Sequence, residues 1–229
     1  MIPPTSIDGT DITGATIDGT DVQEITVDGD VVFSSALTFN DAIENDDLSM
    51  FTGDTSLFST TTAESQQGSR SLAVTNGESG TTGLNGSQII STSGLDNYTS
   101  EGDTFEFYMK PGSITANDDI TFLFGVQNSN TFYRIFTRAR SNSFSDIRKV
   151  INGSEGTVDG FSFNLSSQWY RYEVSWTSSS VSFTQFDENN NSVGSASTSD
   201  LLSTTDGGLG VEKVNDTGVT WYIDDFNIL

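Results

Sequence analysis

The sequence predicts an all-β protein, in which a two-sheet antiparallel jelly-roll sandwich follows a short stem of β repeats. Three observations carry this prediction. Apolar and aromatic residues alternate with polar ones along many short segments, which is the pattern of half-buried strands. Clusters of Gly, Asn, Asp and Ser separate these segments and indicate turns. No segment has the periodicity of a convincing amphipathic helix.

The stem, residues 1–35, contains nearly the same motif three times at a spacing of ten residues: "IDGTDI" from Ile7, "IDGTDV" from Ile17 and "VDGDVV" from Val27. Asp-Gly favours tight hairpin turns. A single short hairpin is marginal in water, and repeats gain stability when neighbours cover their apolar faces. We therefore predict an anchoring or oligomerisation segment; the alternative is that the hairpins fold back on the sandwich. The apolar residues to be covered are Ile7, Ile12, Ile17, Val22, Ile25, Val27, Val31 and Phe33.

The sandwich, residues 36–229, is built from strands of alternating pattern, the clearest of which span residues 103–109, 120–126, 131–137, 169–176 and 180–186. Regularly spaced strands with turn signals are typical of sandwiches, and the length of this region suits a two-sheet jelly roll. The 16 Phe residues and the Trp residues supply the core. In the fourth strand, Tyr170 and Tyr172 share a face with Val174 and Trp176, so we expect both tyrosines to be buried.

The charge of the chain is strongly acidic, with 32 Asp and Glu residues against 9 Lys and Arg residues and a formal net charge of −23. Self-repulsion of this size weakens a compact state in dilute salt, whereas molar salt screens it. This composition indicates a protein from a high-salt environment; the alternative is an ordinary acidic β protein. Nucleic acid is not an expected partner, because phosphate binding requires a basic patch.

The residue types that are missing exclude several kinds of chemistry. The chain has no Cys and no His, so it lacks disulfides, thiolate metal sites and the commonest general base. No apolar run approaches the length of a membrane-spanning helix, and the first residues do not resemble a signal peptide. We therefore expect no membrane insertion, and a route out of the cell other than ordinary secretion, such as assembly into a virus particle.

Several segments carry a resemblance to a known family. They are "LTFNDAIENDD", "EGDTFEFYMKPG", "ITFLFGVQNSNTFYRI", "QWYRYEVSW" and "TWYIDDFNIL", in this order between Leu37 and Leu229. Together they resemble the concanavalin A-like, laminin-G-type jelly roll, and they are similar to versions found in haloarchaeal and haloarchaeal-virus surface proteins. The opening repeats resemble those of virus tail and fibre proteins.

The resemblance implies a place to look for catalysis. Glycosidases of this fold class carry two carboxylates on one strand in a Glu-x-Asp-x-Glu pattern, which sets the separation that their chemistry needs. The pattern is absent here, and Glu106 and Glu173 each stand alone on their predicted strands. The simplest interpretation is that both are solvent-facing side chains. We expect no enzymatic activity.

The resemblance also implies a structural calcium site where the first and last strands meet. The residues at the matching positions are Asn40, Asp41, Gly68 and Asp224. On the last strand Asp224 shares a face with Phe226 and Ile228, so we expect its carboxylate to point between the sheets, where a cation would offset the cost of burial. The family usually has Glu where Asn40 stands, which points to a lost site. The alternative is that Asp224 caps backbone amides or pairs with Arg70.

A second acidic segment, "DENNNSVG" at residues 187–194, begins like a calcium loop. It lacks the Gly and the distant Glu of such a loop. A hairpin turn is the better interpretation.

Exposed aromatic residues are the candidates for stacking on sugars, which related jelly rolls bind. Trp169 lies on the face opposite Tyr170 and Tyr172, beside Arg171, and is the preferred candidate; Tyr98 and Tyr133 are the others. Buried strand aromatics are the more common alternative for all three.

These predictions combine into a hypothesis of function. We expect a non-enzymatic virion protein of a halophilic archaeal virus: a homo-oligomeric fibre, spike or turret anchored to other virion proteins by its stem, with a jelly roll that attaches to host-surface glycans. A capsid decoration protein fits the same layout. A cellular adhesion or carbohydrate-binding module is the other alternative, and a polysaccharide hydrolase or lyase lacks the residues it would need.

Overall fold

The structure is a computed structural model of the 229-residue chain, and the chain divides into two compact units, Met1–Thr38 and Phe39–Leu229. In the first unit the structure describes the backbone of residues 6–7, 10–11, 16–17, 20–21, 24–27 and 30–34, together with residue 38. In the second it describes residues 39–77, 87–91, 99–114, 118–139, 143–156, 159–214 and 218–229. The two units are described separately.

The first unit contains three antiparallel ribbons, each a separate two-stranded sheet. They pair β1 (Ser6–Ile7) with β2 (Thr10–Asp11), β3 (Thr16–Ile17) with β4 (Thr20–Asp21), and β5 (Glu24–Val27) with β6 (Asp30–Ser34). The predicted ten-residue hairpin repeat is therefore present in the backbone. Ile12 and Val22 lie outside the described residues, as do the side chains of the other predicted anchoring residues. Their role in anchoring stays a prediction.

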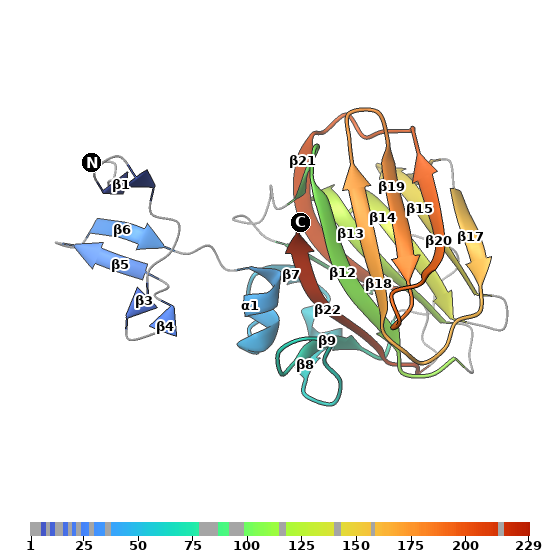
Figure 1. Cartoon of the computed structure of the whole chain (residues 1–229), viewed down its shortest axis with the longest axis horizontal. Coiled ribbons are helices and arrows are strands. Elements are labelled where there is room, and N and C mark those ends of the chain that lie inside the picture. Colours follow the sequence, from blue (N-terminus) through green and yellow to red (C-terminus); the bar gives the residue numbers. More distant parts are fainter. Residues whose placement is uncertain are drawn as a thin grey trace. The chain divides into compact units, whose positions relative to one another are not determined.

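The second unit is a sandwich of two antiparallel sheets, and Figure 1 shows their strands as two layers. The seven-stranded sheet has the order β20-β19-β18-β12-β22-β9-β8. Its strands are β8 (Phe58–Thr61), β9 (Ser71–Val74), β12 (Thr104–Pro111), β18 (Tyr170–Trp176), β19 (Val181–Phe186), β20 (Ser192–Thr198) and β22 (Trp221–Ile228).

The nine-stranded sheet has the order β16-β15-β14-β13-β21-β10-β7, with β11 paired to β21 and β17 paired to β15. Its strands are β7 (Phe51–Gly53), β10 (Ser87–Ser91), β11 (Thr99–Ser100), β13 (Asp118–Asn128), β14 (Thr131–Ala139), β15 (Ser143–Ile151), β16 (Ser154–Glu155), β17 (Asp159–Phe163) and β21 (Asp206–Lys213). The five clearest predicted strands correspond to β12, β13, β14, β18 and β19, and the all-β sandwich prediction is confirmed.

The core lies between the sheets and is built from aromatic rings. Phe107 of β12 is fully buried and stacks on Phe122 of β13 across the two layers, with 3.8 Å between ring centroids. Tyr172 of β18 also stacks on Phe107, with 5.1 Å between ring centroids. Tyr170 and Trp176 are buried on the same face, as the alternation along β18 predicted. The period-two pattern therefore gives the correct inward face for β12 and β18.

In the described residues two short helical segments interrupt the β structure, although the sequence shows no helical periodicity. α1 (Phe39–Glu44) buries Phe39 and Ile43, which are four residues apart and so lie on one face. A 3-10 turn spans Thr55–Leu57. A six-residue helix is too short to produce a periodic signal in the sequence. None of the helices in the described residues is long and apolar enough to cross a membrane.

A β-bulge in the last strand changes the face on which Asp224 lies. Asp225 has a left-handed backbone (φ 54°), and the pairing of β22 with β12 shifts there, so that Asp224 pairs with Tyr108 while Asn227 pairs with Glu106. Tyr108 points away from the core, since its neighbours in β12 point inward. Asp224 consequently lies on the outer face of the sheet, and the prediction that it points between the sheets is wrong. The inserted residue of a bulge reverses the alternation.

Candidate ligand-binding groove on the nine-stranded sheet

The outer face of the nine-stranded sheet carries a cluster of arginines around one aromatic ring. Phe136 of β14 is buried, and the guanidinium carbons of Arg134, Arg138 and Arg148 lie 5.7, 5.2 and 5.0 Å from its ring centroid. Arg134 and Arg138 flank Phe136 on the same face of β14, and Arg148 reaches it from β15. Cations over an aromatic face are attracted to its negative potential. The ring therefore holds three positive groups close together.

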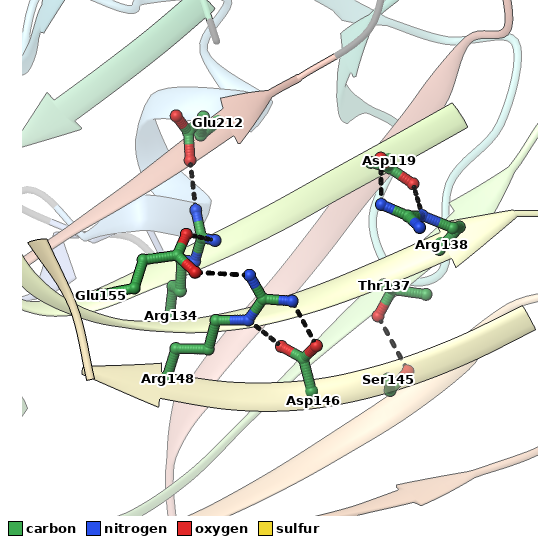
Figure 2. Close-up of polar contacts among 9 residues, drawn as sticks. All are labelled: Asp119, Arg134, Thr137, Arg138, Ser145, Asp146, Arg148, Glu155 and Glu212. Atoms are coloured by element: carbon green, nitrogen blue, oxygen red, sulfur yellow. Dashed lines mark hydrogen bonds and ion pairs between the residues drawn. The ribbon is translucent and has the colours of Figure 1, made fainter. Parts of the chain in front are cut away.

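Four carboxylates neutralise these arginines, and Figure 2 shows how they alternate with the guanidinium groups; they are Asp119, Asp146, Glu155 and Glu212. Asp119 accepts two hydrogen bonds from Arg138, at 2.6 and 3.1 Å. Planar two-point pairing of this kind fixes the orientation of both groups. The cluster has four negative and three positive charges, so it offers no excess positive charge to a ligand.

Asp146 and Arg148 form a second two-point pair. Arg148 Nε and Nη2 donate to the two oxygens of Asp146 at 2.9 and 2.6 Å, and Nη1 donates to Glu155 at 2.7 Å. Glu155 also accepts a hydrogen bond from Arg134, whose other terminal nitrogen lies 3.5 Å from Glu212. One chain of ion pairs thus connects Asp146 in β15 to Glu212 in β21.

Burial sets the electrostatics of this chain of ion pairs. Burial raises the pKa of Asp146 above the ordinary carboxyl value, and the nearby Arg148 and Arg134 offset this only in part. Burial lowers the pKa of Arg134, whose side chain is 0% exposed. Burial alone would lower the pKa of Arg148, but its bonds to Asp146 and its proximity to Glu155 raise it above the ordinary value. Arg148 therefore offsets part of the cost of burying the Asp146 charge.

A groove of about 390 Å³ opens beside this pair, lined by Phe144, Asp146, Arg148, Gly160, Phe161 and Ser162. Gly160 of β17 pairs with Asp146, and a Cβ at position 160 would lie 2.6 Å from the Asp146 Cβ and from the Ser145 carbonyl oxygen. Only glycine fits there without displacing β15. The groove brings together a ring face, a carboxylate, a guanidinium and a hydroxyl, which are the groups that bind polyhydroxylated ligands.

Sequence reasoning missed this groove, because its residues meet only through strand pairing. Phe144, Asp146 and Arg148 alternate along β15, so their shared face follows from the sequence once that strand is assigned. Their partners on β17 follow from the register, in which Gly160 and Ser162 pair with Asp146 and Phe144. The signal that the sequence did carry was the alternation "FSDIR" at residues 144–148.

The seven-stranded sheet brings together the two glutamates that stand alone in the sequence. Glu106 of β12 and Glu173 of β18 are directly paired, and Arg171 Nη1 donates to both, at 3.1 and 2.9 Å. The Arg171 guanidinium lies 4.0 Å from the ring centroid of Phe186. One guanidinium therefore binds both carboxylates. This arrangement suits an ion-pair cluster better than an acid and nucleophile pair.

Two of the predicted calcium residues, Asp224 and Asn40, form hydrogen bonds with the protein backbone. Asp224 Oδ2 accepts from the amides of Gln66 and Gln67, at 2.6 and 3.3 Å, and Oδ1 accepts from the amide of Asp225. Burial raises the pKa of Asp224 to about 6, and these amides lower it only in part. The side chain of Asn40 bonds both backbone groups of Phe226.

The other two predicted calcium residues do not complete a site. Gly68 has φ +60°, and a side chain at this position would collide with the Glu44 carboxylate. That carboxylate accepts hydrogen bonds from the backbone amides of Ser69 and Arg70. Asp41 lies in the first turn of α1. In the part of the chain that the structure describes, no three acidic side chains gather in a way that could hold a metal. The set does not fit a calcium cage as it stands, and calcium here stays a prediction.

Residues 187–191 form the predicted turn of the segment 187–194, and its last three residues belong to β20. β19 ends at Phe186 and β20 begins at Ser192. Asp187 Oδ1 accepts from the amides of Asn189 and Asn191, at 2.9 and 2.8 Å. These bonds within the turn account for the acidic and amide residues of this segment.

The predicted sugar platforms differ in their surroundings. Tyr133 is fully buried against Phe124 and Trp176, and its hydroxyl accepts a hydrogen bond from the Leu202 amide. Burial raises the pKa of Tyr133 to about 12. Tyr133 therefore offers no face to a ligand, and its prediction as a binding residue is wrong, because it lies on the inward face of β14. Trp169 is half-buried just before β18, and its role stays a prediction, while Tyr98 lies outside the described residues.

Solved structures share this architecture. The chain matches a Bacteroides ovatus mixed-linkage glucan GH16 protein in complex with a G4G4G3G product, with a TM-score of 0.51 and 12% identity over 76% of this chain and 86% of that one. The fold is a concanavalin A-like jelly roll. The carbohydrate-binding module CBM66 from Bacillus subtilis matches with a TM-score of 0.49 and 15% identity over 78% of this chain and 93% of that one.

A third match is partial. The Bacteroides ovatus xyloglucan GH43B protein matches with a TM-score of 0.48 and 13% identity over 76% of this chain, but the match spans only 35% of that protein. No protein-family model and no curated protein sequence matches the chain. At these identities the likeness defines the fold.

Proposed function

We propose that this chain is a non-enzymatic glycan-binding protein, whose jelly roll binds an uncharged carbohydrate in the groove beside Asp146 and Arg148. The observation that carries the proposal is the grouping of Phe144, Asp146 and Arg148 around a groove that Gly160 also lines, at a position where only glycine lets β17 approach β15. An aromatic ring offers an apolar face to a sugar ring. A fixed carboxylate accepts hydrogen bonds from the hydroxyls of the sugar, and a fixed guanidinium donates hydrogen bonds to them. The concanavalin A-like fold, which hydrolases of glucans also have, is consistent with this function.

The proposal is tested by binding to a glycan array in molar KCl, with two matched variants. Phe144→Ala removes one of the two rings that line the groove, the one that Arg138 covers at 4.8 Å. Phe186→Ala removes a half-buried ring that Arg171 covers at 4.0 Å on the other sheet. A ring contact is worth about 1 kcal/mol, so we expect Phe144→Ala to weaken binding roughly fivefold and Phe186→Ala to leave it unchanged. Equal losses in the two variants would contradict the assignment of the groove.

The absence of catalysis is part of the proposal. It is supported by Arg171, which donates to both Glu106 and Glu173 and so binds the two carboxylates into one ion-pair cluster. The test is incubation with the polysaccharides that bind best, followed by measurement of reducing ends. Sugar release that Glu106→Gln abolishes would overturn this part of the proposal.

The place of the protein is also proposed: the surface of a halophilic archaeal virus, as a fibre, spike or turret that displays the jelly roll to the host. The support is the acidic sequence and the three tandem ribbons, which suit a segment that joins other chains. Several copies on one particle would convert weak glycan binding into firm attachment. Antibody labelling of purified particles distinguishes a projection from a capsid decoration, and labelling of the host envelope alone would favour a cellular adhesion module.

A further inference from the structure

A lysine and an aspartate meet between the sheets, away from the groove. Lys213 is the last residue of β21 and pairs with Ile120 of β13, and Asp118 is the first residue of β13. Asp118 and Ile120 are two residues apart and so share the inward face of the strand. The Lys213 ammonium contacts Asp118 Oδ1, and both side chains are 0% exposed.

The two other lysines have the same kind of partner in different surroundings. Lys149 contacts Asp200, and the exposed fractions of these side chains are 14% and 42%. Lys110 contacts Glu64, with exposed fractions of 16% and 38%. Water therefore solvates both of these pairs. The Lys213–Asp118 pair differs from them, because neither of its side chains reaches water.

We propose that Lys213 and Asp118 condense to form an intramolecular isopeptide bond. In this step one proton passes from the Lys213 ammonium to the Asp118 carboxylate, and the lone pair of the neutral Nζ then attacks Asp118 Cγ and forms the new C–N bond while the bond from Cγ to Oδ2 breaks. Oδ2 leaves as water with that proton and one further proton from Nζ, so that nothing is oxidised or reduced. Folding buries both groups and holds them in contact. The entropy cost of bringing two reacting groups together is therefore met before the reaction begins.

The backbone assists this step. The amide of Asp119 donates to Asp118 Oδ1 at 2.8 Å. This donor is placed to stabilise the negative charge that develops on the oxygen when the amine adds to Cγ. The product would be a covalent bond between β13 and β21, which are neighbours in the nine-stranded sheet. The bond does not depend on glycan binding.

Mass spectrometry of the denatured protein tests the proposal. The expected result is a mass one water below that of the sequence, together with a branched peptide that joins Lys213 to Asp118 in a protease digest. Lys213→Arg and Asp118→Ala should each restore the full mass of their sequences. Asp118→Asn should give the same final product as the wild type, because the amide nitrogen leaves as ammonia. Lys149→Arg, the matched control, should keep the loss of one water.

The wild-type digest is decisive even where a variant does not fold. Recovery of separate, unmodified peptides that contain Lys213 and Asp118, with no loss of water from the intact chain, would overturn the proposal and leave a buried ion pair. A loss of water that persists in Lys213→Arg would overturn it as well. Glycan binding by the uncross-linked protein would leave the proposed function intact, so the two proposals fail independently.

Discussion

Replacing Arg148 with Met should destabilise the protein in a way that depends on pH. Arg148 holds Asp146 by two hydrogen bonds, and the Asp146 side chain is only 3% exposed. Removal of one member of a buried ion pair costs about 3–5 kcal/mol, since it leaves a charge without a partner. The Arg148 side chain is 16% exposed, so we expect the lower end of this range, about 3 kcal/mol, at about pH 8.

The sign of the pH dependence follows from Asp146. Burial already raises its pKa in the folded protein, and loss of the guanidinium raises it further, whereas the unfolded value does not change. Between these two pKa values the folded state binds a proton that the unfolded state does not. The free energy of unfolding therefore increases as the pH falls, and it levels off below the unfolded value. The destabilisation by Arg148→Met should thus be smaller near pH 5 than near pH 8.

The assay is urea denaturation at both pH values in molar KCl, followed by the fluorescence of the buried Trp176 and Trp221. The double variant Asp146→Asn/Arg148→Met has no stranded charge, so it should recover most of the lost stability and lose the pH dependence. The reasoning is refuted if Arg148→Met costs the same at both pH values, or if the double variant is no more stable than the single one.

Four further predictions follow from the charge, the stem and Asp224. Deleting Met1–Phe33 should turn an oligomer into a monomer, as measured by light scattering in molar KCl; an unchanged mass would remove the oligomerisation role. The melting temperature should rise with KCl as the Debye length falls from about 10 Å to about 3 Å, because a net charge of −23 is screened; a constant value would contradict the high-salt assignment. Since the pKa of Asp224 is raised to about 6 from 3.8, its contribution to stability is full at acid pH and is lost as the pH rises through about 6. The loss amounts to at most about 3 kcal/mol, and Asp224→Asn should abolish it in urea titrations. Calcium should leave the melting temperature of the wild type unchanged relative to a chelator, because Asp224 already accepts from backbone amides, and a rise that Asp224→Asn abolishes would restore the calcium site.

The sequence predicts the sandwich well because strand alternation is a local property. In β12, Phe105, Phe107 and Met109 recur at every second position, and all three are fully buried. Such a pattern needs no knowledge of which strands are neighbours. The inward tyrosines of β18 were predicted for the same reason. Tyr133 shares the inward face of β14 with Ile135. The alternation along this strand places its ring in the core, so the prediction that Tyr133 is an exposed ring is wrong.

The candidate site was not predictable, because it depends on register between strands. Glu106 and Glu173 are 67 positions apart in the sequence yet directly paired in the sheet, and nothing local indicates which residue of β18 lies opposite Glu106. A one-residue change of register moves every side chain of a strand to the other face. The bulge at Asp225 causes such a change of face within a single strand. Because one residue has a left-handed backbone, Asp224 lies on the outer face and not on the core face.

The distribution of cations bears on the kind of ligand that the proposed groove would accept. Each of the eight Lys and Arg residues in the described part of the chain lies within an ion pair, while the chain as a whole carries 32 acidic residues. The described surface therefore offers no unpaired cation to an acidic sugar, and its net charge repels one. At molar salt even this repulsion is confined to about 3 Å, so that attraction at a distance contributes nothing to recognition. Binding must then rest on contacts at short range, which are a ring face and hydrogen bonds to fixed groups. An uncharged glycan satisfies these contacts without breaking the Asp146–Arg148 pair, whereas a carboxylated or sulfated one would have to compete with Asp146 for the guanidinium.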